Sequence, residues 1–270
     1  MNSLLRRIII GALAVSVPVG GAIYVITNNG SSDEENKNNV VEKGKDTNTE
    51  KDDKGNNKKN DNEKNPGTDA VEENEHSLKI ASLREEYNNN EIVGVISIPN
   101  TNLSTVVVQH NDNEYYLNHN AYKAENIEGA VYLDYRVDVN SGRKNIIYGH
   151  NGNSSNLYVP FSELEKYYDN SFYKNNQYVY LEDEKGIGKY QIFSVFVETR
   201  DTNYLYLNFK SDSSWYEHIS YLKNKSMYDT GVSVDSSDDV LVLQTCSHNE
   251  EYSKYKDKYL IVVAKRVLYQ

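Results

Sequence analysis

The chain has 270 residues, a net charge of −11 and a mean hydropathy of −0.74. Phosphate recognition needs a basic surface, so this acidic chain, which also lacks a Gly-rich phosphate loop and zinc-finger spacing, is not expected to bind nucleic acid. No group of residues has metal-ligand spacing, and we expect neither a metal nor another cofactor. The single cysteine, Cys246, excludes an internal disulfide.

The first 76 residues differ in composition from the rest. An uncharged apolar stretch over residues 8–26 follows Arg6 and Arg7 and nearly spans a hydrocarbon core of about 30 Å. The positive-inside rule predicts a cytoplasmic tail at 1–7, a transmembrane anchor at 8–27 and an extracellular remainder, which makes a single-pass protein of the cell membrane. A cleavable signal peptide is the alternative. Residues 28–76 are almost wholly polar, which predicts a disordered linker.

Residues 77–270 have the pattern of one globular domain. A helix is predicted over 76–87, and shorter helices over 159–168 and 214–226. Stretches of alternating or continuous apolar residues predict strands at 92–98, 104–109, 129–135, 144–150, 177–183, 188–199, 240–245 and 259–268. Because many of these strands are neighbours in sequence, we expect a mostly antiparallel, closed β-barrel with peripheral helices.

Cys246 comes directly after the apolar strand predicted at 240–245. A rigid strand that ends at a loop can both fix a reactive side chain and leave it accessible. A thiol attacks a carbonyl as the thiolate, so it needs a nearby base or cation. His150 ends another predicted strand in the pattern Tyr-Gly-His-Asn, and His248 lies two residues after the cysteine. Spacing alone leaves both histidines open as its partner.

Seven motifs together resemble the class B sortases, in the same order along the chain. They are VGVISIP (93–99), VVVQ (106–109), DNEYYLNHN (112–120), GAVYLDYR (129–136), IIYGHN (146–151), LVLQTCS (241–247) and IVVAKRV (261–267). The resemblance covers essentially all of 77–270. It implies a closed eight-stranded sortase-type barrel, here preceded by the transmembrane helix and the disordered linker.

The resemblance also implies an activity, that of a membrane-anchored cysteine transpeptidase of Gram-positive bacteria. Cys246 would be the nucleophile and His150 the acid/base. Such an enzyme cleaves a C-terminal sorting signal, similar to Asn-Pro-x-Thr-Asn or Asn-Pro-x-Thr-Gly, after Thr through a thioacyl intermediate. It then joins the protein to an amine of peptidoglycan. The expected partners are surface proteins that bear the signal, and peptidoglycan or its lipid-linked precursor.

One residue departs from the family pattern. Class B sortases have an Arg in the last strand, facing the cysteine, and the alignment puts Tyr259 in that position. The Arg holds the substrate backbone or the oxyanion, which a Tyr hydroxyl can do only as a neutral donor. Strand alternation turns the neighbouring Lys258 to the opposite face. We therefore predict that Tyr259 substitutes, with a cation from a loop or a slow enzyme as alternatives.

The resemblance carries over a substrate groove, position by position. Its predicted members are Asn113, Leu117, Tyr148, Tyr204, Leu205 and Gln244. Core packing is the alternative for the two leucines, and a plain sheet position for Tyr148.

Two other functions are compatible with the residues. A cell-wall cysteine peptidase or amidase would use the same Cys246 and His150 pair with water as the acceptor. A tethered surface adhesin would carry the cysteine without using it.

Overall fold

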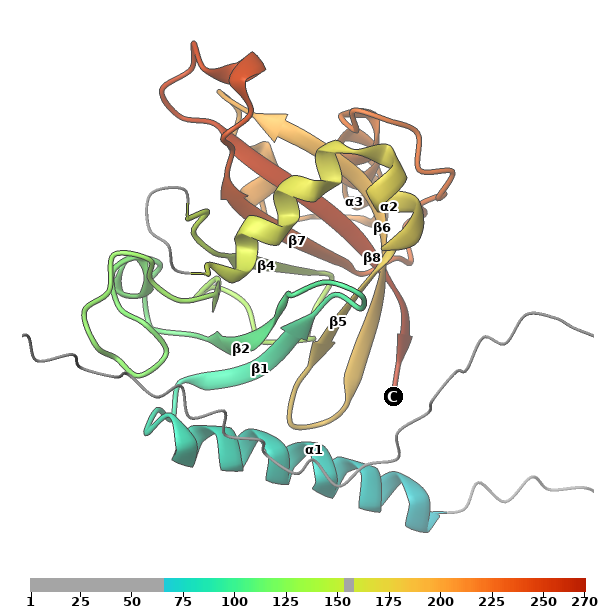
Figure 1. Cartoon of the computed structure of the whole chain (residues 1–270). Helices are drawn as coiled ribbons and strands as arrows, with labels where there is room; N and C mark the ends of the chain where they lie inside the picture. Colours follow the sequence, from blue (N-terminus) through green and yellow to red (C-terminus); the bar gives the residue numbers. More distant parts are fainter. Residues whose placement is uncertain (1–65, 153–157) are drawn as a thin grey trace, which may run out of the picture. The chain divides into compact units, whose positions relative to one another are not determined.

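The computed structural model describes residues 66–152 and 158–270, with side chains from residue 75 onward (Figure 1). The strands are β1 Ile92–Ser97, β2 Ser104–Val108, β3 Tyr132–Leu133, β4 Lys144–Tyr148, β5 Tyr178–Glu182, β6 Ile187–Glu198, β7 Val240–Cys246 and β8 Tyr259–Tyr269. The α-helices are α1 Pro66–Glu86, α2 Asn170–Asn175 and α3 Asp212–Asn224. The 3-10 helices are η1 Tyr115–Leu117, η2 Pro160–Tyr168, η3 Asn203–Leu205 and η4 Glu250–Tyr252.

The strands close into a barrel in the order β1-β2-β3-β4-β7-β8-β6-β5. Most neighbours are antiparallel, whereas β2 with β3 and β4 with β7 are parallel. The predicted closed eight-stranded, mainly antiparallel barrel is therefore confirmed. The β4–β7 pair matters most for the site, because parallel neighbours end at the same edge of the sheet.

Two apolar clusters lie on opposite faces of the strands. One takes a buried residue from every strand, among them Ile147 of β4 and Leu243 of β7, and therefore fills the barrel. The other contains the alternate residues, such as Ile146 and Val242, and packs them against Trp215 of α3 and Tyr204 of η3. Cys246 has the parity of Val242, so its side chain belongs to this second, outer face.

The helix before the barrel begins at Pro66, earlier than the predicted start at residue 76, so residues 66–76 of the predicted linker are helical. Proline suits the first turn of a helix, and a helix needs no apolar run to form when its end is held. That hold comes from ion pairs of His76 and Lys79 with Glu182 of β5, at 2.7 and 2.5 Å. The prediction of disorder from low apolar content was therefore wrong for residues 66–76.

The predicted tail at 1–7, the anchor at 8–27 and the first part of the linker, 28–65, lie outside the described residues. Within the residues that the structure does describe, no helix combines the length and the apolar character required to cross a bilayer.

Two other elements differ from the expectation. The strand predicted over 129–135 is reduced to Tyr132–Leu133, because Gly129 has a φ of 58° and the Ala130 N–H donates to the Tyr116 oxygen of η1. The helix predicted over 159–168 is present as a 3-10 helix that starts at Pro160.

Candidate active site

His150 lies two residues after the end of β4, and Cys246 is the last residue of β7, the parallel strand beside it. Tyr148 of β4 is in register with Gln244 of β7, and the Gly149 N–H donates to the Gln244 oxygen at 3.1 Å. His150 lies two residues after Tyr148, and Cys246 lies two residues after Gln244. The parallel register therefore brings the imidazole and the thiol to the same level at one edge of the barrel, although 95 residues separate Asn151 from Cys246 in sequence.

Cys246 is exposed at the surface, but neighbouring residues partly shield its thiol from solvent. This burial raises the pKa of the Cys246 thiol. The positive charge of Lys258 lowers the pKa and the negative charge of Asp257 raises it, both to a smaller extent than burial does. The thiol of the unliganded protein is therefore held mainly in its protonated form.

The His150 ring is oriented by a backbone carbonyl. Its Nε2 lies 2.7 Å from the Leu117 oxygen of η1. A carbonyl only accepts hydrogen bonds, so Nε2 carries the hydrogen and Nδ1 is the nitrogen of the neutral ring that can take a proton. Sequence reasoning missed this contact, because a main-chain oxygen leaves no signal in the choice of residue.

Asn151 connects the two catalytic strand ends. Its Nδ2 donates to the Cys246 oxygen at 2.9 Å. The residue after the imidazole thus holds the main chain of the residue that carries the thiol. The Asn of the Tyr-Gly-His-Asn motif was part of the resemblance, and this hydrogen bond supplies a physical reason for its presence.

Two glycines make room around the imidazole. A Cβ on Gly149 would lie 2.7 Å from the Phe161 ring, so close packing against Phe161 explains this glycine. A Cβ on Gly129 would lie 2.4 Å from the Tyr116 oxygen and 3.0 Å from Cδ2 of His150. The Gly129 backbone therefore packs directly against one edge of the His150 ring.

Tyr259 lies directly opposite Cys246 in the antiparallel β7–β8 pair. Directly paired residues project to the same face, so the phenol neighbours the thiol. Burial raises the pKa of the Tyr259 hydroxyl, and the charges of Asp257 and Cys246 raise it further. Tyr259 is therefore a neutral donor at physiological pH. Lys258, the residue before β8, has the other parity, yet its charge still acts on the thiol.

Three of the predicted groove residues, Tyr148, Tyr204 and Leu205, belong to one outer-face cluster with Tyr259. A fourth, Gln244, has the same parity in β7 and is bonded to Tyr204. The Tyr204 hydroxyl donates to Oε1 of Gln244 at 2.8 Å, and Tyr204 is only 2% exposed. The Tyr148 hydroxyl donates to the buried Asp134 carboxylate at 2.7 Å. Both tyrosines are therefore buried, and their hydroxyls are engaged within the protein.

The two remaining groove residues lie on the loop between β2 and β3. The Leu117 side chain is 43% exposed, and the main-chain carbonyl of the same residue orients His150. Asn113 accepts a hydrogen bond from the Tyr135 N–H at 3.1 Å and is half-buried. This loop thus joins the groove to the acid/base candidate.

His248, the other candidate partner of the thiol, faces η2. Its N–H donates to Oε1 of Glu165 at 2.8 Å, and its Nδ1 lies 3.7 Å from the same oxygen. The strand register favours His150, since only that residue lies level with Cys246 on a directly paired strand.

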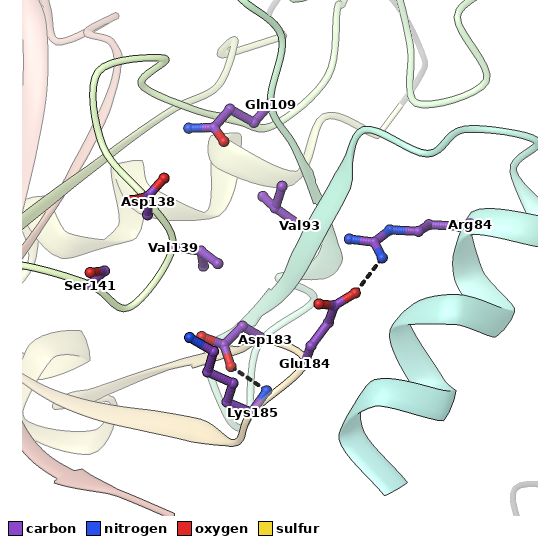
Figure 2. A pocket seen from close by; sticks show the side chains of 9 residues that line it. All are labelled: Arg84, Val93, Gln109, Asp138, Val139, Ser141, Asp183, Glu184 and Lys185. Carbon is purple, nitrogen blue, oxygen red and sulfur yellow. Dashed lines mark hydrogen bonds and ion pairs between the residues drawn. The ribbon is translucent and has the colours of Figure 1, made fainter. Parts of the chain in front are cut away.

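The surface pockets differ in their relation to this site. A pocket of about 310 Å³ lies between the end of α1, β1 and the β5–β6 turn, and Figure 2 shows the Arg84–Glu184 ion pair at its border. None of the predicted site residues lines it. A smaller pocket of about 220 Å³ is lined by His150 and Gly129 together with residues of β2 and the β2–β3 loop.

Comparisons with known proteins agree with this geometry. The sortase domain model matches residues 96–267. Sortase B of Staphylococcus aureus is 30% identical over 178 residues, which cover 66% of this chain and 70% of that protein. Sortase B of Listeria monocytogenes is 33% identical over 171 residues, which cover 62% and 67% of the two chains.

Solved structures show the same fold. A mutant form of Clostridium perfringens sortase B superposes with a TM-score of 0.63 at 26% identity, covering 72% of this chain and 90% of that one. The strand order of the barrel, the equal level of His150 and Cys246 and the sequence matches agree with one another. The chain therefore belongs to the sortase family and is a class B sortase, a cysteine transpeptidase.

Proposed function

We propose that the protein cleaves a C-terminal sorting signal of the Asn-Pro-x-Thr-Asn or Asn-Pro-x-Thr-Gly kind after its Thr and transfers the Thr carbonyl to an amine of peptidoglycan or its lipid-linked precursor. The observation that carries the proposal is the β4–β7 register, which sets His150 level with Cys246. The cargo would be surface proteins that end in such a signal.

The reaction uses the two residues in turn. As Sγ of Cys246 attacks the Thr carbonyl carbon, Nδ1 of His150 takes the thiol proton and then gives it to the nitrogen of the leaving peptide. The C–N bond breaks and a thioester remains on the cysteine. The acceptor amine attacks that thioester and loses a proton to His150, and the thiol is released with its proton restored.

Tyr259 has the position for stabilising the charged intermediate. The tetrahedral intermediate carries a negative oxygen, and a preorganised donor near it lowers the barrier. The Tyr259 phenol lies opposite the thiol and is neutral, so it donates one hydrogen bond without adding a charge. This is the role that we assign to it in place of the family Arg.

The test uses the purified domain, a panel of sorting-signal peptides and an added amine such as triglycine. We expect a new peptide–amine product whose yield rises with amine concentration, and a thioacyl adduct on Cys246 by mass spectrometry. Cys246→Ala should give neither. Hydrolysis that no amine can divert would favour a peptidase, and no cleavage of any peptide would favour a binding role.

The predicted anchor supports an extracellular domain held at the cell membrane by residues 8–27. Membrane fractionation of cells that produce the full chain, followed by protease treatment of intact protoplasts, tests this. We expect the protein in the membrane fraction and its domain degraded from outside. Recovery in the medium would show that the segment is removed as a signal peptide.

A further inference from the structure

Lys144, the first residue of β4, is a lysine where a core residue would be expected. It is only 4% exposed, and its parity in β4 turns it to the same outer face as Tyr148. Burying an ammonium group is costly unless its hydrogen bonds are satisfied. Among the described residues, no carboxylate is close enough to form an ion pair with it. A lysine at the surface would not carry this cost. The burial of Lys144 must therefore be explained by the contacts that its ammonium group makes.

The contacts of Lys144 all go to the segment around η3 and to α3. Its Nζ donates to the Tyr204 oxygen at 2.5 Å and to the Tyr206 oxygen at 2.9 Å. The third neighbour is Nε2 of His218 in α3, at 2.9 Å. All three ammonium hydrogens therefore have an acceptor, and one side chain joins β4, η3 and α3.

The segment around η3 is also bonded to β7, the strand that carries Cys246. The Tyr204 main chain is bound to Lys144 at the start of β4, while its hydroxyl is bound to Gln244, two residues before Cys246. The next residue, Leu205, is one of the predicted groove members. Its oxygen accepts a longer contact from Arg136, at 3.4 Å. The hold on η3 thus determines where one wall of the groove lies.

We propose that Lys144 is a positioning residue, which fixes η3 against β4 and β7 and thereby sets the affinity of the groove for the sorting peptide. Its effect on the peptide depends on the proposed function, whereas its hold on η3 does not. The residue acts through Tyr204 and Leu205 and does not touch the reacting atoms. Its loss should therefore change KM more than kcat.

The charges around Lys144 allow the contact to persist at neutral pH. Burial and the nearby Arg136 lower the pKa of Lys144 to about 7, against the opposing effect of Asp134. Burial and Lys144 lower the pKa of His218 to about 3. A neutral His218 accepts from the ammonium form. When the lysine is neutral, its two N–H groups still reach the carbonyls, and the other His218 tautomer donates to its lone pair.

Lys144→Met is the informative variant, and Lys265→Met is its matched control. Both lysines are in register with Val240, one on each side of β7, but Lys265 pairs with Asp238 and not with η3. We expect Lys144→Met to raise KM for the peptide about tenfold, as loss of a buried hydrogen-bonded group predicts, with kcat within about twofold. The control should leave KM unchanged.

Two further measurements separate this role from general damage. Alkylation of Cys246 by iodoacetamide needs no groove, so its rate should be the same in both variants and in the wild type. Amide exchange at Leu205 and Tyr206, whose N–H groups bond within η3, should become faster only in Lys144→Met. If that variant does not fold, Lys144→Gln keeps an amide donor at the site and should show the same two effects more weakly.

Equal KM values and equal exchange in Lys144→Met and wild type would overturn the proposal. An equal rise of KM in the Lys265→Met control would also overturn it. If the wild-type enzyme cleaves no sorting peptide, the proposed function fails, and the exchange at η3 then decides the role of Lys144 on its own.

Discussion

The side chains next to Cys246 work against its ionisation. Burial and Asp257 raise the pKa of the thiol, and the lowering by Lys258 does not compensate for them. A protonated thiol is a weak nucleophile, so its proton must leave as the sulfur attacks. Nδ1 of His150 is the ring nitrogen available for this, because Nε2 is engaged with Leu117. A thiol that is protonated at rest is also less prone to oxidation.

The charges beside the thiol should control its reactivity in opposite directions. Removing the negative charge in Asp257→Asn lowers the Cys246 pKa, so alkylation by iodoacetamide at pH 8 should become faster, by about two- to fivefold. Lys258→Met should slow it by a similar factor. The alkylation rate, measured by mass spectrometry at several pH values, gives the pH midpoint for the Cys246 thiol in each variant. Midpoints that are the same as in the wild type would contradict the electrostatic explanation. Lys254→Met, in the same loop and not among the charges acting on Cys246, is the control.

Tyr259 is tested by removing only its hydroxyl. We expect Tyr259→Phe to reduce kcat at least about tenfold, because one donor to the oxyanion is lost, while the melting temperature stays close to that of the wild type. Tyr269→Phe, at the other end of the same strand, removes a hydroxyl that bonds to Asp183 and should leave kcat unchanged. Full activity of Tyr259→Phe would remove this hydroxyl from the mechanism.

At the scale of elements, the site depends on how strands and loops meet. The parallel β4–β7 pair sets the levels of His150 and Cys246, and η1 supplies the carbonyl that orients the imidazole. Gly129 allows η1 and the ring to approach each other, since any side chain there would enter the space of both. The ring orientation is therefore a property of the loop packing as much as of the histidine itself.

Gly129→Ala should damage the site more than its backbone strain alone explains. Its φ of 58° is unfavourable for alanine, and the added Cβ would overlap the Tyr116 oxygen and press on His150. Gly142→Ala is the matched control, because Gly142 has a φ of 65° but open space around its Cβ position. Both should lose about 1–2 kcal/mol of stability from strain, and only Gly129→Ala should also lose most of its kcat.

The quantity to compare in this pair is kcat per folded molecule. Transpeptidation and chemical denaturation are measured on both variants under the same conditions. If Gly129→Ala keeps wild-type kcat, the close approach to His150 has no catalytic meaning.

At the scale of the whole described chain, polar contacts tie separate elements to the barrel. Contacts of α1 with Glu182 and Glu184 hold the end of that helix to β5 and to the β5–β6 turn. On another face, Lys144 and His218 hold α3 and η3 to β4. These contacts contain groups that titrate, so the stability of the fold should depend on pH.

Lys144 makes a defined contribution to that dependence. Its pKa is about 7 in the folded protein and 10.5 in the unfolded chain, so between these values the unfolded chain binds more protons. Stability then rises with pH across this window, with a limiting slope of about 1.4 kcal/mol per pH unit for one group. The difference in unfolding free energy between wild type and Lys144→Met should therefore grow in favour of the wild type from pH 7 to pH 10.

Urea unfolding at several pH values measures this difference. Lys265→Met serves again as the control, since Lys265 is only half-buried and pairs with the Asp238 carboxylate. A constant difference over the whole window would mean that Lys144 keeps an ordinary pKa in the folded protein.

The sequence by itself determined most of the strands and the closed barrel, because apolar alternation is a local pattern, and its specific motifs proposed His150 and Cys246 as the reactive pair. It also placed Tyr259 opposite the thiol, which the β8 register bears out as a position while its role stays a prediction. It did not show that α1 begins at Pro66, since a helix tethered by ion pairs has no apolar signature.

Only the tertiary structure decided how these parts act together. The Leu117 carbonyl that orients His150 is a main-chain atom, common to every residue, so no residue choice could reveal it. Lys144 looks like any surface lysine until the chain folds η3 and α3 over it. Levels, orientations and buried charges depend on contacts between distant segments, and those exist only after the barrel has closed.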